Sequence, residues 1–152
     1  MKRGVCFISS TGGHLSQIRQ LLSVFNKEDA CLITEGNQTS SKNSMRTYYL
    51  QQQDRKKITF PIVVLLNIFL SIYFYFKIKP KVIISTGAGA VIPFCFIGKV
   101  FGSKIIFIES FAKINSPTIT GRIIYKIADS FYIQWEELRE YYPNSIYKGT
   151  IY

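Results

Sequence analysis

Short apolar runs followed by helical patterns repeat along this chain. Residues 4–9 are mostly apolar and typical of a buried strand, and a polar turn with two glycines ends that run. Apolar residues then recur at helical spacing, at Leu15, Ile18, Leu22 and Phe25. The pattern predicts a strand, a glycine turn and an amphipathic helix that ends near Asn26.

The same order returns in the middle of the chain. Residues 82–85 predict a strand, residues 85–90 a turn of small residues, and residues 91–101 an apolar helix that Gly102 ends. Two such units in one parallel sheet place both turns at its carboxyl edge, where α/β proteins bind ligands. We therefore expect the two turns to form one wall of a cleft.

The remaining segments complete an alternating order of strands and helices. We expect a mobile polar loop over 35–43 and a helix that starts at Pro117. Further segments are predicted as strands at 30–34, 47–50, 104–108, 130–134 and 146–148, and as a short helix at 135–141. The sequence thus predicts an α/β, Rossmann-like fold in a single domain, residues 1–152, with a doubly wound, mostly parallel sheet of about six strands.

Residues 60–76 contain no charged side chain and are flanked by lysines. As a helix the segment would be roughly 25 Å long. Asn67, Ser71 and Tyr75 would share one face and leave the others apolar. Three placements are open: a buried crossover helix, a helix that packs on the sheet and dips another face into a bilayer surface, and a membrane span. A parallel sheet disfavours the span, because both helix ends must then lie on one side of the bilayer.

The composition favours a membrane surface over nucleic acid as the anionic partner. Apolar residues make up 47% of the 152 positions and aromatic residues 15%, which indicates a folded domain with its own core. The formal net charge is +10, and residues 36–108 hold ten cations against one acid, Asp54: Lys42, Arg46, Arg55, Lys56, Lys57, Lys77, Lys79, Lys81, Lys99 and Lys104. Nothing in the sequence resembles a nucleic-acid-binding module, whereas a basic surface beside an apolar segment suits an anionic membrane.

The cysteines predict a reducing compartment. Cys6, Cys31 and Cys95 lie in apolar runs without a CxxC pair or a nearby histidine, so we expect buried, reduced thiols in a cytosolic protein. The apolar run after Lys2 and Arg3 is too short for a secretory signal, and we expect none.

The first turn carries candidate chemistry. Gly12 and Gly13 leave the backbone amides open to a ligand, and these amides precede a helix, whose N-terminus favours an anion. His14, the only histidine, stands beside them. An imidazole there suits a general base at neutral pH. The alternative is a histidine that only caps or orients the turn.

Five segments, taken in order, resemble a known family. They are 9–14 (SSTGGH), 84–89 (ISTGAG), 108–110 (IES), 121–129 (GRIIYKIAD) and 133–138 (IQWEEL). In these segments the chain resembles the asparagine-linked glycosylation protein 14 family, the acceptor-side, membrane-anchoring subunits of a two-part UDP-N-acetylglucosamine transferase. The bacterial counterparts of that family serve capsule and exopolysaccharide synthesis.

The resemblance implies a split GT-B glycosyltransferase in which this chain is the N-terminal, acceptor-binding half. A partner subunit would bind the UDP-sugar donor, so this chain would hold no cofactor and no metal and would be inactive alone. Eukaryotic members carry an added N-terminal membrane helix, whereas this sequence starts on its first strand and ends where a one-chain enzyme enters its second domain. We therefore expect residues 60–76 to attach it to the cytoplasmic face of the cell membrane.

The resemblance also implies a mechanism. A lipid-linked sugar diphosphate would bind to the two turns, through Ser10, Thr11, Gly12, Gly13, Thr86, Gly87, Ala88 and Gly89. His14 would remove a proton from the acceptor hydroxyl, and Glu109 would orient His14 or bind an acceptor hydroxyl, or else neutralise a lysine. Asp129 would end its helix and bond the backbone. Membrane association would use Lys56, Lys57, Phe60, Leu65, Phe69, Phe76, Lys77 and Lys79.

Two rival functions remain at this stage. The chain would be a non-catalytic scaffold if its partner alone transferred sugar and needed only an anchor. A dinucleotide-dependent enzyme is disfavoured, because the first turn lacks GxGxxG and Glu35, after the second strand, enters a polar loop. The resemblance allows N-acetylglucosamine, galactose or glucose as the transferred sugar.

Overall fold

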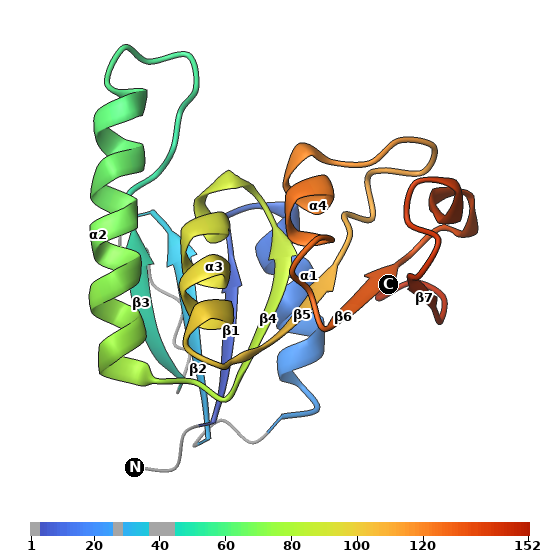
Figure 1. The fold of residues 1–152 in the computed structure, drawn as a ribbon, viewed down its shortest axis with the longest axis horizontal. Coiled ribbons are helices and arrows are strands. Elements are labelled where there is room, and N and C mark those ends of the chain that lie inside the picture. Colours follow the sequence, from blue (N-terminus) through green and yellow to red (C-terminus); the bar gives the residue numbers. More distant parts are fainter. Residues whose placement is uncertain (1–3, 26–28, 37–44) are drawn as a thin grey trace.

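The computed structural model describes residues 4–25, 29–36 and 45–152. These residues form one seven-stranded sheet in the order β3-β2-β1-β4-β5-β6-β7, and every pair of neighbouring strands is parallel (Figure 1). The strands are β1 Val5–Ser9, β2 Ala30–Glu35, β3 Arg46–Leu50, β4 Val82–Gly87, β5 Lys104–Ile108, β6 Ser130–Ile133 and β7 Ile146–Tyr147.

Helices cover both faces of the sheet. The α-helices are α1 Gly13–Leu22, α2 Phe60–Ile78, α3 Ile92–Val100 and α4 Ile119–Ile124. Two 3₁₀ helices are also present, η1 Gly89–Val91 directly before α3 and η2 Glu136–Glu140 between β6 and β7. Helix α1 lies on one face, and α2, α3 and α4 lie on the other (Figure 1). From β1 the chain adds β2 and β3 on one side and then β4 to β7 on the other, so the strand order reverses between β1 and β4, as in a doubly wound sheet.

The predicted α/β fold is confirmed, with local differences. The sheet has seven strands rather than about six, because all the predicted strand segments pair, including the short last one, which forms β7 beside β6. Helix α4 begins at Ile119 and not at Pro117, because the Thr118 side chain accepts a hydrogen bond from the Gly121 N–H and caps the helix there. Helix α1 ends at Leu22, with Ser23 as its C-cap, and not near Asn26. Most of the polar loop predicted over 35–43, with Lys42, lies outside the described residues.

The core forms on both faces of the sheet. The larger cluster lies under α2, α3 and α4 and includes Ile8, Ile83, Phe94 and Phe107, while the smaller packs Phe7 and its neighbours under α1. Cys6, Cys31 and Cys95 are buried and free, as the sequence predicts. Burial raises the pKa of the Cys95 thiol to about 12, so this thiol stays protonated.

Helix α2 has its polar residues inside and its apolar residues outside. The buried face consists of Asn67, Ser71, Phe74 and Tyr75. Asn67 pairs with the backbone of Gln51, accepting from its N–H and donating to its carbonyl, both at 2.8 Å. The large apolar side chains on the outer faces are exposed: Ile62, Leu65, Leu66, Ile68, Phe69, Ile72, Tyr73 and Phe76. A fully buried crossover helix, one of the three predicted placements, is therefore wrong.

Candidate functional site

The two glycine turns meet at the carboxyl edge of the sheet, as predicted. Strands β1 and β4 are direct neighbours, and Ser9 pairs with Gly87 after a shift in register. The Ser10 N–H donates to the Gly87 carbonyl at 3.4 Å, directly joining the two turns. This edge is also the point where the strand order reverses, which is the usual ligand-binding position in open α/β sheets.

His14 is bonded to the second turn from the first residues of α1. Its Nδ1 lies 2.7 Å from the carbonyl oxygen of Thr86, and the Thr86 hydroxyl donates to the His14 carbonyl at 2.8 Å. Since a carbonyl oxygen only accepts, Nδ1 carries the proton in this bond. In the neutral imidazole Nε2 is then the free acceptor, which is the tautomer a general base needs.

The backbone of the second turn is adapted to this contact. Gly87 has a φ of 112°, which side chains rarely adopt, and an added Cβ would stand 3.3 Å from the His14 Cε1. Ala88 has a φ of 78° and a ψ of 161°, a region that is normally restricted to glycine. Strain of this kind is held by the surrounding structure and is typical of ligand sites.

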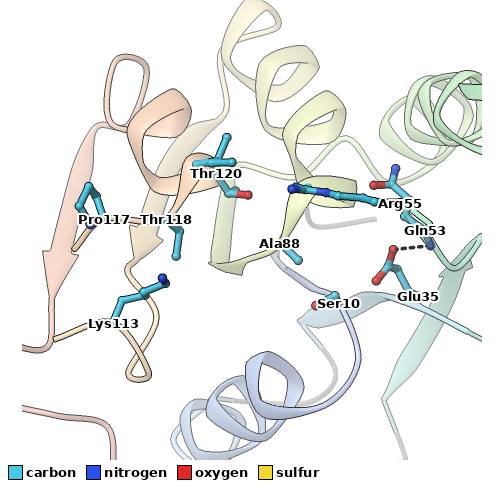
Figure 2. Close-up of a pocket in the computed structure, with 11 residues that line it drawn as sticks. Ser10, Glu35, Gln53, Arg55, Ala88, Lys113, Pro117, Thr118 and Thr120 are labelled. Atoms are coloured by element: carbon cyan, nitrogen blue, oxygen red, sulfur yellow. Dashed lines mark hydrogen bonds between the residues drawn. The ribbon is translucent and has the colours of Figure 1, made fainter. Parts of the chain in front are cut away.

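A cleft of about 470 Å³ opens beside these turns (Figure 2). Its lining consists of Ser10, Glu35, Gln53, Arg55, Ala88, Gly89, Lys113, Pro117, Thr118, Ile119 and Thr120. Arg55 and Lys113 enter from opposite sides, and their side chains point toward the space between them (Figure 2). Gly89 starts the η1–α3 segment, whose first N–H groups have no partner within the helix. Cations and helix-end amides together suit an anion.

Only part of the predicted diphosphate-binding set lines this cleft. Ser10, Ala88 and Gly89 do, whereas Thr11, Gly12 and Gly13 are exposed outside it. Thr86 and Gly87 differ from the prediction because both are buried and already bonded. The Thr86 hydroxyl donates to His14, and the Gly87 N–H donates to the Ser85 hydroxyl at 3.1 Å. Neither group is therefore available to a phosphate.

Glu109 does not fill the predicted catalytic role. Its side chain is 0% exposed, and its carboxylate accepts hydrogen bonds from the Ser110 N–H, the Thr118 N–H and hydroxyl, and the Tyr142 hydroxyl. Among the described residues, no hydrogen bond joins it to His14 or to a lysine. Burial and the neighbouring Glu109 raise the pKa of Tyr142, which keeps its hydroxyl a donor. Glu109 instead fixes the entry to α4.

The sequence did not identify most of the cleft. Arg55 enters the sequence analysis only as one of the ten cations, and Lys113 lies in a connection predicted only as polar. Glu35 was set aside because it precedes a polar loop. The signal available in the sequence was the position of Glu35 at the end of a buried apolar run, which places it at the carboxyl edge of the sheet.

The predicted membrane-association residues lie on helix α2 or directly beside its two ends. Leu65, Phe69 and Phe76 are exposed on α2, and Phe60 is half-buried at its start. Lys56 and Lys57 are exposed before the helix. Lys77 lies over the rings of Tyr48 and Tyr73, at 5.3 and 5.6 Å from their centroids, and Lys79 caps the helix end in a left-handed conformation. By length and composition α2 is long and apolar enough to cross a membrane.

Asp129 bonds the backbone as predicted, but it does not end its helix, because α4 ends at Ile124 and Asp129 directly precedes β6. One carboxylate oxygen accepts from the Ile105 N–H at 2.8 Å, and the other accepts from Lys99 at 2.6 Å. In the described part of the chain, no three metal-ligating side chains of His, Cys, Asp or Glu lie together.

Known solved structures share this fold. MurG from Acinetobacter baumannii superposes with a TM-score of 0.68 at 14% identity, over 89% of this chain and 42% of that one. UDP-N-acetylglucosamine 2-epimerase from Rickettsia bellii superposes with a TM-score of 0.71 at 16% identity, over 97% of this chain and 45% of that one. The chain spans less than half of either protein, and this likeness confirms a Rossmann-like domain of the GT-B class.

Sequence relatives identify the family. UDP-N-acetylglucosamine transferase subunit ALG14 from Rattus norvegicus is 26% identical over 178 residues, which cover 97% of this chain and 82% of that protein. The Homo sapiens protein of the same name is 23% identical over 177 residues, and the Saccharomyces cerevisiae one 46% over 50 residues. The family model for oligosaccharide biosynthesis protein Alg14 like matches residues 5–151. This chain therefore belongs to the Alg14-like family of oligosaccharide biosynthesis proteins.

Proposed function

We propose that this chain is the acceptor-binding subunit of a two-part glycosyltransferase and that it acts at a membrane surface. The observation that carries the proposal is the cleft at the carboxyl edge, into which Arg55 and Lys113 point. Its lining includes Ser10 and Ala88, which belong to the two turns that the His14–Thr86 bond joins. The family relatives are named as UDP-N-acetylglucosamine transferase subunits, which supports sugar transfer as the reaction. The donor, a UDP-sugar, is bound by the partner subunit.

The acceptor is a lipid-linked sugar diphosphate. Its phosphates lie between Arg55 and Lys113, near the Ser10 hydroxyl and the first amides of the η1–α3 segment. The Arg55 guanidinium lies close to Gly89, since a Cβ added at that glycine would be 3.5 Å from Nη2. A side chain on Gly89 would therefore occupy the space in which the guanidinium and the phosphates meet.

His14 is the general base of the transfer. Its Nδ1–H is held by the Thr86 carbonyl, so Nε2 takes the proton from the acceptor hydroxyl. The hydroxyl oxygen forms a bond to the anomeric carbon of the donor, and the bond from that carbon to the UDP oxygen breaks. UDP leaves on the partner subunit, and the proton stays on the imidazole until solvent removes it.

Helix α2 attaches the chain to the bilayer. Ile62, Leu65 and Phe69 are 63, 55 and 61% exposed, and such an apolar surface is expensive in water. Figure 1 shows α2 extending beyond the carboxyl edge of the sheet, the same edge that carries the cleft. The segment before the helix places Ile58, 97% exposed, next to Lys56 and Lys57. An apolar tip with cations beside it suits an anionic lipid surface.

The interfacial placement of α2 fits its contacts better than a span. The helix packs along β3 and α3, and its buried polar face is bonded to the chain through Asn67 and Gln51. A span would carry the edge of the sheet into the hydrocarbon. The cytoplasmic face of the cell membrane is the proposed location, and capsular or exopolysaccharide repeat units are the proposed product.

The proposal is tested with the reconstituted pair of subunits. Arg55→Gln with Lys113→Gln is expected to raise the acceptor KM at least tenfold, because each charged hydrogen bond contributes about 1.5–3 kcal/mol. Lys81→Gln with Lys104→Gln removes the same charge from exposed positions at the opposite edge of the sheet. An equal change in KM for both double variants would show that no diphosphate site exists between Arg55 and Lys113.

A further inference from the structure

Glu35 is a buried carboxylate in a cleft that otherwise suits anions. It ends β2, is 7% exposed, and lines the cleft together with Arg55 and Lys113. Its Oε1 accepts a hydrogen bond from the Gln53 N–H at 3.0 Å. Burial raises the pKa of the Glu35 carboxyl above its usual value, and the bond from Gln53 opposes that rise.

The second carboxylate oxygen of Glu35 is available to a ligand. Within the described residues, Oε2 has no hydrogen-bond partner, and it is not among the side-chain atoms shut off from solvent. Figure 2 shows one oxygen bonded toward Gln53 and the other directed away from it. Among the described residues, this oxygen therefore has unused acceptor capacity on the cleft side of Glu35.

Neither cation of the cleft neutralises Glu35. In the described part of the chain, the single salt bridge is Lys99–Asp129, so Arg55 and Lys113 both lie beyond ion-pair distance of this carboxylate. A carboxylate beside a diphosphate repels it. A ligand that brings hydrogen-bond donors compensates for this cost, and paired sugar hydroxyls are such donors. In dinucleotide-binding folds, a carboxylate about 20 residues after the glycine turn binds the ribose 2′-hydroxyl.

We propose that Glu35 binds hydroxyl groups of the sugar that is attached to the acceptor diphosphate. This inference rests on the proposed function, since it takes Arg55 and Lys113 as the diphosphate site. Glu35 is then a specificity residue: it weakens the binding of a bare lipid diphosphate and favours one that carries a sugar. The cleft is large enough for both groups, at about 470 Å³.

Two probes that share the lipid and the diphosphate, one with and one without the sugar, separate these effects. Citronellyl diphosphate and citronellyl-diphosphate-linked N-acetylglucosamine are titrated by calorimetry into the full chain in lipid nanodiscs. The Glu35→Gln variant keeps an oxygen for the Gln53 N–H and loses the charge, so its melting temperature is expected to stay close to that of the wild type. We expect it to bind the sugar-bearing probe at least tenfold more weakly and the bare diphosphate equally or more tightly.

The outcomes distinguish this inference from the proposal beneath it. Equal weakening of both probes, or unchanged binding of the sugar-bearing probe, would overturn the role of Glu35 while wild-type binding of the bare diphosphate still supported the acceptor site. Arg55→Gln is the matched variant, and it is expected to weaken both probes alike. Wild-type protein that bound neither probe would overturn the acceptor site itself, and the role of Glu35 with it.

Discussion

His14 and Thr86 bond each other in both directions across the two glycine turns. The imidazole Nδ1 lies 2.7 Å from the Thr86 carbonyl, and the Thr86 hydroxyl lies 2.8 Å from the His14 carbonyl. The two residues are 72 positions apart in the sequence. The pair therefore fixes one turn to the other and also fixes the tautomer of the single histidine.

Gly87→Ala should displace His14 and lower the rate of sugar transfer. The new Cβ would stand 3.3 Å from the His14 Cε1 and 3.4 Å from Nδ1, so the ring must shift slightly and its bond to the Thr86 carbonyl is disturbed. We expect kcat of the reconstituted pair to fall at least tenfold. Gly102→Ala is the control, because Gly102 also has a positive φ, 84°, but its Cβ would meet nothing within 4 Å. Equal losses in the two variants would mean that backbone strain, and not the imidazole, controls the rate.

Charges on the exposed face of α2 should release the chain from membranes. Leu65→Asp with Phe69→Asp places two carboxylates where the bilayer is proposed to lie, and each is costly in hydrocarbon. We expect the purified wild-type chain to float with anionic liposomes and this variant to stay in solution. Val24→Asp, at a 78% exposed position after α1, should float like the wild type. Flotation of the double variant at wild-type levels would exclude α2 as the anchor.

The basic flank of α2 gives a graded test of the same surface. Replacing Lys56, Lys57, Lys77 and Lys79 with Gln should weaken flotation on anionic liposomes, by about 1 kcal/mol for each charge near the surface. Lys77 should contribute least, because it already lies over Tyr48 and Tyr73. Binding measured against salt concentration checks this, and an unchanged salt dependence in the variant would rule out the electrostatic contribution.

Substitutions around the buried Glu109 carboxylate should lower the stability of the fold. In Gly121→Ala the new Cβ would overlap the Glu109 carboxylate and the Tyr142 hydroxyl, so we expect a loss of several kcal/mol, on the order of 3. Tyr142→Phe removes one buried donor and should cost about 1–3 kcal/mol. Urea unfolding measures both changes. A Tyr142→Phe protein of wild-type stability would contradict this role for Glu109.

Acid should weaken the fold through Asp129. Partial burial alone would raise the pKa of this carboxyl, but hydrogen bonds from Lys99 and the Ile105 N–H, with nearby cations, lower it overall. Its ionised form therefore stabilises the fold above the unfolded-state pKa, about 3.9, and this contribution is lost as the pH falls through the lower folded-state value. The pair is partly exposed, so Asp129→Asn should cost only about 1 kcal/mol at pH 7 and less at pH 3. A cost that did not shrink with pH would contradict the ionic origin.

The strand pattern was predictable because burial on a parallel sheet leaves continuous apolar runs. The runs at β1, β4 and β5 are buried by helices, so the sequence shows them clearly. The start of α4 was not predictable from the local sequence. It depends on Thr118, whose N–H and hydroxyl donate to the carboxylate of Glu109, nine residues earlier in the chain. The sequence correctly predicted that Asn67, Ser71 and Tyr75 share one face of α2. That this face is buried was not predictable, because Asn67 is bonded to the backbone of Gln51, which lies before the helix.

The turns of the site followed from the sequence, and the cleft did not. Glycines and the single histidine mark the turns locally. Glu35 ends β2, whereas Arg55 and Lys113 lie in the connections after β3 and β5, and the three converge only because parallel strands end at one edge. The misassignment of Glu109 has a related cause: its strand-end position is shared by ligand-binding carboxylates, and the four hydrogen bonds that bury it come from residues later in the chain.

The most direct test is the turnover of the reconstituted pair with His14→Ala, measured with saturating acceptor and UDP-sugar. As general base His14 should account for a loss of about 10²–10⁴-fold in kcat. Gln20→Ala, exposed on the same helix, should keep wild-type turnover. An unchanged kcat for His14→Ala would contradict the account, because this chain would then be a scaffold that anchors a partner able to transfer sugar by itself.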